Sequence, residues 1–164
     1  MHKLATILSV CAFFFGLAPL SAHGTEVMRP GVLQIGGHTA DGKAISFTIA
    51  DLERLPHTKF TTTTPWHTGP TTFEGVLVRD LLAAIGAKGS KFEAVCLDKY
   101  IAEIPSDDWT TYNLMLAYKR DGSYMQIKDK GPFLLVYPFD SEPALQTAKY
   151  YARSAWQLAS ITIE

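Results

Sequence analysis

Short segments in which hydrophobic and polar residues alternate run through most of this chain. Ile45, Phe47 and Ile49 alternate with Ser46 and Thr48, the period-two pattern of a strand that buries one face. Other short runs rich in β-branched and aromatic residues are bounded by residues that favour turns. The pattern predicts strands at residues 32–35, 45–49, 59–64, 72–76, 92–97, 100–104, 114–118, 124–127, 133–137 and 158–163.

One segment, residues 77–85, shows helical periodicity instead. Its apolar side chains fall on one helical face, and they are Leu77, Leu81, Leu82 and Ile85. Gly86 provides a suitable C-terminal stop. Single helical turns are expected at residues 51–55 and at residues 106–112, the latter capped by residues 106–108. Mostly short strands with one good helix predict an α+β domain, with a mixed sheet that closes on itself.

Two segments indicate how the later strands are arranged. The pair Asp121-Gly122 separates two apolar runs, and Asp-Gly pairs suit the tight turn of a β-hairpin. We therefore expect residues 114–118 and 124–127 to pair as neighbouring antiparallel strands. Residues 133–137 are almost wholly apolar, which is typical of a strand covered on both faces.

The N-terminus has the pattern of a secretory signal peptide. Lys3 precedes an apolar run at residues 4–20, and small residues follow it at Ser21-Ala22. The alternative is a retained membrane span, but the run is short for a bilayer and contains Gly16 and Pro19. We expect residues 1–22 to be removed, residues 23–164 to form a single domain, and the mature protein to be periplasmic without direct membrane insertion.

Charge and cysteine content exclude several classes of function. The formal net charge is -1, and no basic block suggests nucleic acid or a lipid surface as a partner. Cys11 lies in the expected signal peptide, so Cys96 is the only thiol expected in the mature chain. No intrachain disulfide or cysteine-rich zinc site follows from one cysteine. We interpret Cys96 as a packed, inert residue of a strand rather than a reactive thiol.

Familiar catalytic motifs are absent from the sequence, and the histidines lack metal-ligand spacing. What remains is a set of aromatic residues beside polar ones. Trp66 stands in a polar Thr/His/Gly loop, and Tyr100 directly follows Asp98-Lys99. Tyr151 and Trp156 flank a basic segment, where the alternative is that both rings simply fill the core. Exposed aromatic rings beside cations suit flat heteroaromatic ligands.

Several segments together resemble the molybdopterin-binding domain of sulfite-oxidase-like oxidoreductases. The resemblance spans roughly residues 33–164 and is best over residues 100–164. The segments that carry it are FTTTTPWHTGPTTFEG at 60–75, DKY at 98–100, YIAEIP at 100–105, LAY at 116–118, DG at 121–122, DKGP at 129–132 and YP at 137–138. The resemblance implies the sulfite-oxidase-like fold and a pterin-type cofactor.

Two departures from this family argue against its redox chemistry. The cysteine that ligates molybdenum in the family is replaced within residues 61–64, which are all threonine. A hydroxyl is a poor substitute for a thiolate on such a metal. Residues 133–135 are Phe-Leu-Leu, where family enzymes tend to place an arginine toward the cofactor. A neutral pterin without phosphate therefore suits the chain better than the full metal cofactor.

A shorter, exported branch of this fold that lacks the cysteine is more similar still, through TTTPW at residues 62–66 and ARSAWQL at residues 152–158. That resemblance implies a periplasmic pterin-binding protein. Its members report pterin binding to an inner-membrane enzyme that makes or degrades cyclic di-GMP. Carried over by position, the ligand-binding residues are Thr64, Trp66, Asp98, Tyr100, Lys130, Tyr151, Arg153 and Trp156.

The leading hypothesis is thus a non-catalytic sensory protein that holds a reduced pterin between aromatic rings, without molybdenum. Asp98 is expected to accept hydrogen bonds from the amino-pyrimidinone edge, while Lys130 and Arg153 hold the ring carbonyl or the side-chain hydroxyls. Two alternatives stay open. The chain is a molybdopterin-dependent oxidoreductase or a subunit of one, or it is a structural subunit whose pocket has collapsed.

Overall fold

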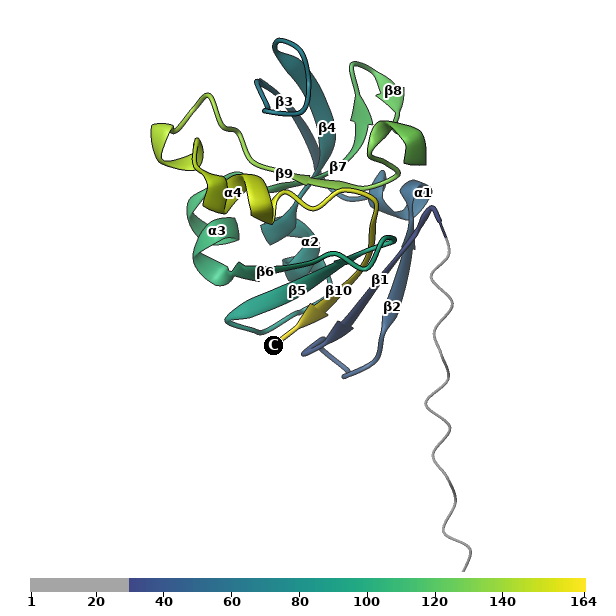
Figure 1. Cartoon of the computed structure of the whole chain (residues 1–164). Helices are drawn as coiled ribbons and strands as arrows, with labels where there is room; N and C mark the ends of the chain where they lie inside the picture. Colours follow the sequence, from purple (N-terminus) through teal and green to yellow (C-terminus); the bar gives the residue numbers. More distant parts are fainter. Residues whose placement is uncertain (1–29) are drawn as a thin grey trace, which may run out of the picture.

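Two five-stranded sheets organise residues 30–164, the part of the chain that the computed structural model describes (Figure 1). The first sheet has, in spatial order, β2 (Ile45–Thr48), β1 (Val32–Gly37), β10 (Leu158–Ile163), β5 (Lys91–Cys96) and β6 (Ile101–Pro105). The second has β3 (His57–Thr62), β4 (Thr71–Leu77), β7 (Met115–Arg120) and β8 (Ser123–Tyr124), with β9 (Leu134–Val136) on β7.

The strand pairing makes the first sheet mixed and the second wholly antiparallel. In the first sheet β1 runs parallel to β10, and the other pairs are antiparallel. The outer strands of each sheet do not pair with one another among residues 30–164. The expectation of one sheet closing on itself is therefore wrong, because the strands divide between two open sheets.

Short helical segments connect and cover the strands. The α-helices are α1 (Ile49–Leu52), α2 (Val78–Ala84), α3 (Ser106–Thr111) and α4 (Ala148–Arg153). The 3₁₀ turns are η1 (Ile127–Asp129) and η2 (Pro143–Leu145). Both α3 and α4 lie beside β6 at one side of the molecule (Figure 1). No helix within residues 30–164 is long and apolar enough to cross a membrane.

The predicted elements are close to the observed ones, with shifts at their ends. Ile49 begins α1 instead of ending β2, because Thr48 and Asp51 form a capping box there. Ile127 belongs to η1, not to the strand after the hairpin. The helix α4 was not predicted from the sequence. The expected signal peptide, residues 1–22, lies outside the described residues.

The hairpin and the apolar strand are confirmed. Asp121 and Gly122 have φ angles of 49° and 79°, which are the two left-handed residues that a tight hairpin turn needs. They join β7 to β8, where Arg120 pairs with Ser123. All three residues of β9 are buried, as expected for a strand covered on both faces.

Cys96 is packed in the core. Its side chain is buried at the end of β5, and burial raises the pKa of its thiol to about 11. The neighbouring Asp98 carboxylate raises the thiol pKa further. The interpretation of Cys96 as a packed residue of a strand is therefore confirmed, and a raised thiol pKa disfavours the reactive thiolate.

The segment between α4 and β10 joins the two sheets and positions the site. Ala155 accepts a hydrogen bond of 2.8 Å from the amide of Leu135 in β9, and Trp156 forms a β-bridge with Leu134. On the other side, the carbonyl of Gln157 accepts a 2.9 Å bond from the amide of Leu97. Trp156 is therefore held between β9 and the turn that follows β5.

Candidate ligand-binding site

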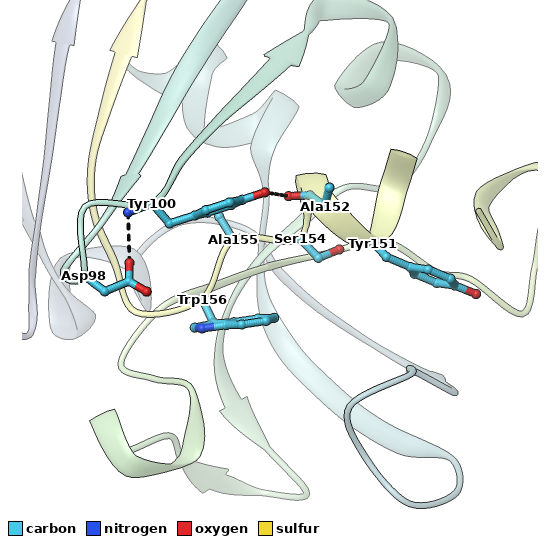
Figure 2. Close-up of a pocket in the computed structure, with 7 residues that line it drawn as sticks. All are labelled: Asp98, Tyr100, Tyr151, Ala152, Ser154, Ala155 and Trp156. Carbon is cyan, nitrogen blue, oxygen red and sulfur yellow. Dashed lines mark hydrogen bonds between the residues drawn. The ribbon is translucent and has the colours of Figure 1, made fainter. Parts of the chain in front are cut away.

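A pocket of about 210 Å³ lies between the β5–β6 turn and the C-terminal end of α4 (Figure 2). It is lined by Asp98, Tyr100, Tyr151, Ala152, Ser154, Ala155 and Trp156. Figure 2 shows the rings of Tyr100 and Trp156 on opposite sides of the pocket, with Asp98 at one end. Four predicted ligand-binding residues, Asp98, Tyr100, Tyr151 and Trp156, thus come together here.

Asp98 and Tyr100 are fixed by the turn between β5 and β6. Lys99 between them has a φ of 70°, and Asp98 Oδ1 accepts a 2.9 Å hydrogen bond from the Tyr100 amide. The other carboxylate oxygen of Asp98 has no hydrogen-bond partner among residues 30–164. The Tyr100 hydroxyl donates to the carbonyl of Ala152 at 2.8 Å, so it ties this turn to α4. The ring of Tyr100 remains available to a ligand, since the residue is 45% exposed.

Behind the pocket, Trp66 joins the aromatic cluster. Its ring meets Trp156 edge to face with 5.6 Å between centroids, and it meets Tyr151 in the same way at 6.3 Å. Tyr151 in turn packs on Phe139 at 5.0 Å. The Trp66 indole Nε1 is buried without a hydrogen-bond partner in the described structure. Trp66 therefore supports the two pocket rings but does not itself line the pocket.

Lys130 approaches the cluster from η1. It has a left-handed backbone with a φ of 69°, and its Nζ lies 3.9 Å from the centroid of the Trp156 ring. This is cation–π distance. Lys130 does not line the pocket, although sequence similarity assigned it a direct ligand contact.

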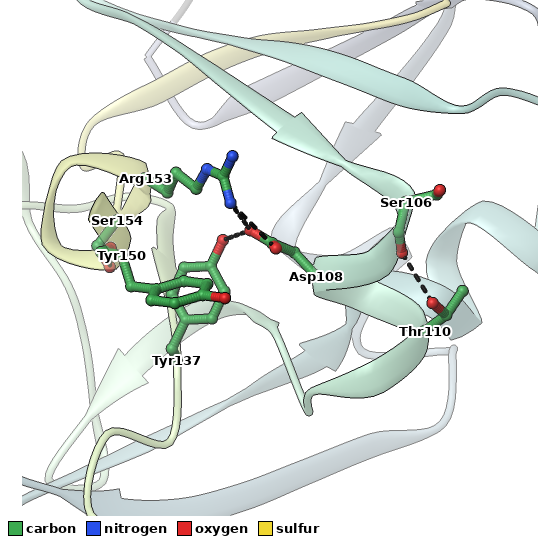
Figure 3. A network of polar contacts seen from close by, with 7 residues as sticks. All are labelled: Ser106, Asp108, Thr110, Tyr137, Tyr150, Arg153 and Ser154. Atoms are coloured by element: carbon green, nitrogen blue, oxygen red, sulfur yellow. Dashed lines mark hydrogen bonds and ion pairs between the residues drawn. The ribbon is translucent and has the colours of Figure 1, made fainter. Parts of the chain in front are cut away.

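Arg153 forms a buried ion pair behind α4 (Figure 3). Its Nη1 lies 3.1 and 3.0 Å from the two carboxylate oxygens of Asp108 in α3. The Tyr137 hydroxyl donates to the same carboxylate at 2.6 Å, and burial together with this bond raises the pKa of Tyr137 well above its ordinary range. Arg153 is thereby turned away from the pocket and holds α4 against α3.

The roles of Asp108 and Tyr137 were not predicted from the sequence. Asp108 was expected only as part of a helix cap, yet it lies inside α3 and is 2% exposed. A buried carboxylate needs partners, but which cation comes from the far end of the chain is visible only in three dimensions. A weak signal was the acidic pair Asp107-Asp108 beside the apolar Trp109.

The threonines of residues 61–64 are occupied by protein contacts. Thr61 Oγ1 lies 2.8 Å from Thr72 Oγ1, and Thr62 Oγ1 accepts a 3.0 Å bond from the amide of Asp140. The amide and hydroxyl of Thr63 both donate to the Asp140 carboxylate. Thr64 is buried, and its hydroxyl lies 3.0 Å from His67 Nδ1.

His67 connects Thr64 to Arg120. Arg120 Nη1 lies 3.0 Å from His67 Nε2, and a guanidinium only donates, so Nε2 must accept. His67 is then neutral, with its proton on Nδ1, and it donates to Thr64 Oγ1. Burial lowers the pKa of His67, and the charges of Arg120 and Lys130 lower it further.

These residues suit a flat organic ring better than a thiolate-bound metal. Among residues 30–164 no three His, Cys, Asp or Glu side chains gather closely enough to hold a metal ion. The one described thiol, Cys96, is buried and protonated. Molybdenum bound through a thiolate therefore does not fit the donors present, whereas the pocket offers aromatic faces and a carboxylate to a pterin ring.

Comparison with known proteins identifies the family. The sequence profile of the oxidoreductase molybdopterin binding domain matches residues 32–140, and the chain belongs to this family. The predicted α+β, sulfite-oxidase-like molybdopterin-binding fold is thus confirmed. The match ends before α4, so Tyr151, Arg153 and Trp156 lie beyond it. No curated protein matches the chain closely enough to supply a relative.

Solved structures include proteins with the same fold at low sequence identity. One is the sulfane dehydrogenase SoxCD from Paracoccus pantotrophus, with a TM-score of 0.62 and 22% identity. The similarity covers 80% of this chain and 37% of that chain. The present chain therefore spans little more than a third of that protein, and the likeness concerns the fold.

Proposed function

We propose that this protein binds a pterin without catalysing a reaction and acts as a periplasmic sensor. The observation that carries the proposal is the pocket in Figure 2, where Tyr100 and Trp156 face a common space with the Asp98 carboxylate at its end. A pterin is flat and presents neighbouring N–H donors on its amino-pyrimidinone edge. Each aromatic contact contributes about 0.5–1.5 kcal/mol beyond the area it buries.

Asp98 suits the donor edge of such a ring. Only its Oδ1 is bonded within the described chain, to the amide of Tyr100, and each carboxylate oxygen can accept more than one hydrogen bond. The pocket lining contains no cationic side chain, because Arg153 pairs with Asp108 and Lys130 lies against Trp156. This charge distribution favours a neutral pterin over one that carries a phosphate.

The non-catalytic part of the proposal depends on residues 61–64. In enzymes of this family that segment supplies the cysteine that ligates molybdenum, as the sequence comparison above implies. Here its hydroxyls are engaged by Thr72, Asp140 and His67. A hydroxyl is a hard ligand, whereas the family's cysteine supplies a soft thiolate to molybdenum. Residues 61–64 therefore offer no suitable ligand for redox chemistry at that metal.

The sensory part rests on the similarity of TTTPW and ARSAWQL to the exported branch of the fold. We propose that the mature protein lies in the periplasm and reports to the periplasmic domain of an inner-membrane enzyme that makes or degrades cyclic di-GMP. A ligand shifts such a partner only if the bound and free proteins bind it with different affinity. The affinity between the two purified domains should therefore change when pterin is added. Equal affinity with and without pterin would contradict the sensory role.

The second candidate is a molybdopterin-dependent oxidoreductase, or a subunit of one. Membership of the oxidoreductase molybdopterin-binding family favours it, as does the fold shared with a sulfane dehydrogenase. It requires a metal ligand elsewhere in the protein, because residues 61–64 are all threonine and supply no thiolate.

Calorimetry with a tetrahydropterin tests the pocket directly. Residues 23–164 should bind one equivalent saturably, and Asp98→Asn should weaken binding about tenfold because it removes a charged acceptor. Asp107→Asn, at an exposed position of α3 outside the pocket, is the matched control and should bind like the wild type. Absence of binding would overturn the proposed function, and equal affinity in the Asp98→Asn variant would exclude this pocket as the site.

A further inference from the structure

Lys130 lies against a ring that forms the wall of the pocket, without lining the pocket itself. Its Nζ is 3.9 Å from the centroid of the Trp156 ring, while Trp156 lines the pocket. Figure 2 shows the Trp156 ring edge-on with Tyr100 on one side, and Lys130 covers the Trp156 ring without lining the pocket. The cation and the pocket therefore lie on different sides of one indole.

The backbone holds Lys130 in place relative to Trp156. The Lys130 carbonyl accepts a 3.1 Å hydrogen bond from the amide of Gln157, the residue next to Trp156. The Gln157 side chain donates to the carbonyl of Ile127 at 2.8 Å, which ties η1 to the same segment. Lys130 is itself half-buried, so its charge is less screened than that of a fully exposed lysine. These hydrogen bonds thus hold the ammonium group of Lys130 beside the Trp156 ring.

A cation on one face of an aromatic ring draws the π electrons toward itself. The negative face potential of the indole is then reduced on the opposite face, which is the face that a ligand in the pocket stacks on. An electron-poor face stacks better on an electron-rich ring than on an electron-poor one. The two redox states of a pterin differ in this respect. The tetrahydro form carries electron-donating amines on its pyrimidinone, whereas the oxidised form is an electron-poor bicyclic heteroaromatic.

We infer that Lys130 makes the pocket selective for a reduced pterin by acting through the Trp156 ring. The inference rests on the proposed pterin-binding function and adds the residue that sets the preference for the reduced form. Lys130 is then a specificity residue that does not touch the ligand. Direct contact of its ammonium group with a ligand carbonyl would instead raise the affinity for both redox states, because both carry that carbonyl.

The ratio of two affinities separates these roles. Tetrahydrobiopterin and biopterin are titrated into residues 23–164 under anaerobic conditions, and the wild type should prefer the reduced form. Lys130→Met removes the charge and should reduce this preference about threefold, while Lys130→Arg keeps a cation over the ring and should retain it. Lys149→Met is the matched control, since Lys149 Nζ lies 5.0 Å from the Tyr150 ring, outside the pocket, and this variant should leave the ratio unchanged.

Each outcome has a distinct meaning. If the wild type binds neither compound, the proposed function fails, and this inference fails with it. If the wild type binds both and Lys130→Met leaves their ratio unchanged, or weakens both equally, only the role assigned to Lys130 is overturned. Lys130→Gln provides a second neutral variant where Lys130→Met does not fold, and the same ratio decides.

Discussion

Two neighbouring regions of this fold differ in how their polar and aromatic groups are used. In residues 61–64 the hydroxyls of Thr61, Thr62, Thr63 and Thr64 all make hydrogen bonds within the protein. In the pocket, by contrast, Asp98 keeps a carboxylate oxygen without a partner in the described chain, and the Tyr100 ring stays exposed. The threonine hydroxyls have their hydrogen-bond partners within the protein, whereas the pocket keeps groups that are open to a ligand.

This difference indicates which of the two regions is open to a ligand. Thr63 donates to Asp140 and Thr64 is hydrogen-bonded to His67, so these side chains make contacts that stabilise the fold. The rings around the pocket pack partly edge to face, as Trp66 does against Trp156, while Tyr100 and Trp156 border a common space that suits a flat ligand. We therefore predict that substitutions around residues 61–64 change the stability of the protein, whereas substitutions in the pocket rings change its pterin affinity.

The largest expected effect concerns the ion pair that holds the α4 wall of the pocket. Arg153→Met leaves the Asp108 side chain, which is 3% exposed, as a buried charge without its cation. Removing one partner of such a pair costs about 3 kcal/mol in the free energy of unfolding. Urea unfolding measures the loss. Lys91→Met, which breaks an exposed pair with Glu103, is the control and should shift the urea midpoint far less. Equal midpoints for Arg153→Met and wild type would contradict this role.

Next in size is the loss of the aromatic wall. Trp156→Ala removes one stacking face and should weaken pterin binding about tenfold. Calorimetry measures the change, and Tyr124→Ala removes an aromatic ring at an exposed position outside the pocket as a control. Undiminished affinity in Trp156→Ala would show that the ligand does not stack there.

The threonine region should respond in the opposite way. Asp140→Ala removes the acceptor for the amide and hydroxyl of Thr63, and this should lower the free energy of unfolding by about 1 kcal/mol. The pterin affinity should stay as in the wild type. A fall in affinity as large as that of Trp156→Ala would mean that the two regions form one site.

The smallest effect is a pH dependence that comes from His67. Its pKa lies below the ordinary histidine value of 6.5, so the unfolded chain takes up this proton more readily than the folded one. The stability that His67 contributes is fully present above pH 6.5 and is lost as the pH falls toward the depressed folded pKa. His67→Gln should flatten the pH dependence of the free energy of unfolding, measured in urea, between about pH 5 and about pH 7.5. Parallel profiles for wild type and His67→Gln would contradict the neutral state inferred from the Arg120 contact.

Local patterns in the sequence were sufficient for the strands and insufficient for the site. Alternation located β2, and Asp121-Gly122 located the hairpin, because strands and tight turns depend on neighbouring residues. The role of Arg153 depends on Asp108, which precedes it by 45 residues, and no local signal links the two. Likewise Lys130 was expected to touch the ligand, whereas its position over Trp156 depends on how η1 packs against the segment after α4.

Two properties define the proposed protein: its pocket binds a pterin, and it binds no molybdenum. The most direct test is the molybdenum and pterin content of one sample of the mature protein, purified from a host that makes the molybdenum cofactor. We expect bound pterin to approach one equivalent per chain and the molybdenum content to lie far below one equivalent. One molybdenum atom per chain would overturn the proposal of a metal-free pterin-binding protein and favour the oxidoreductase alternative.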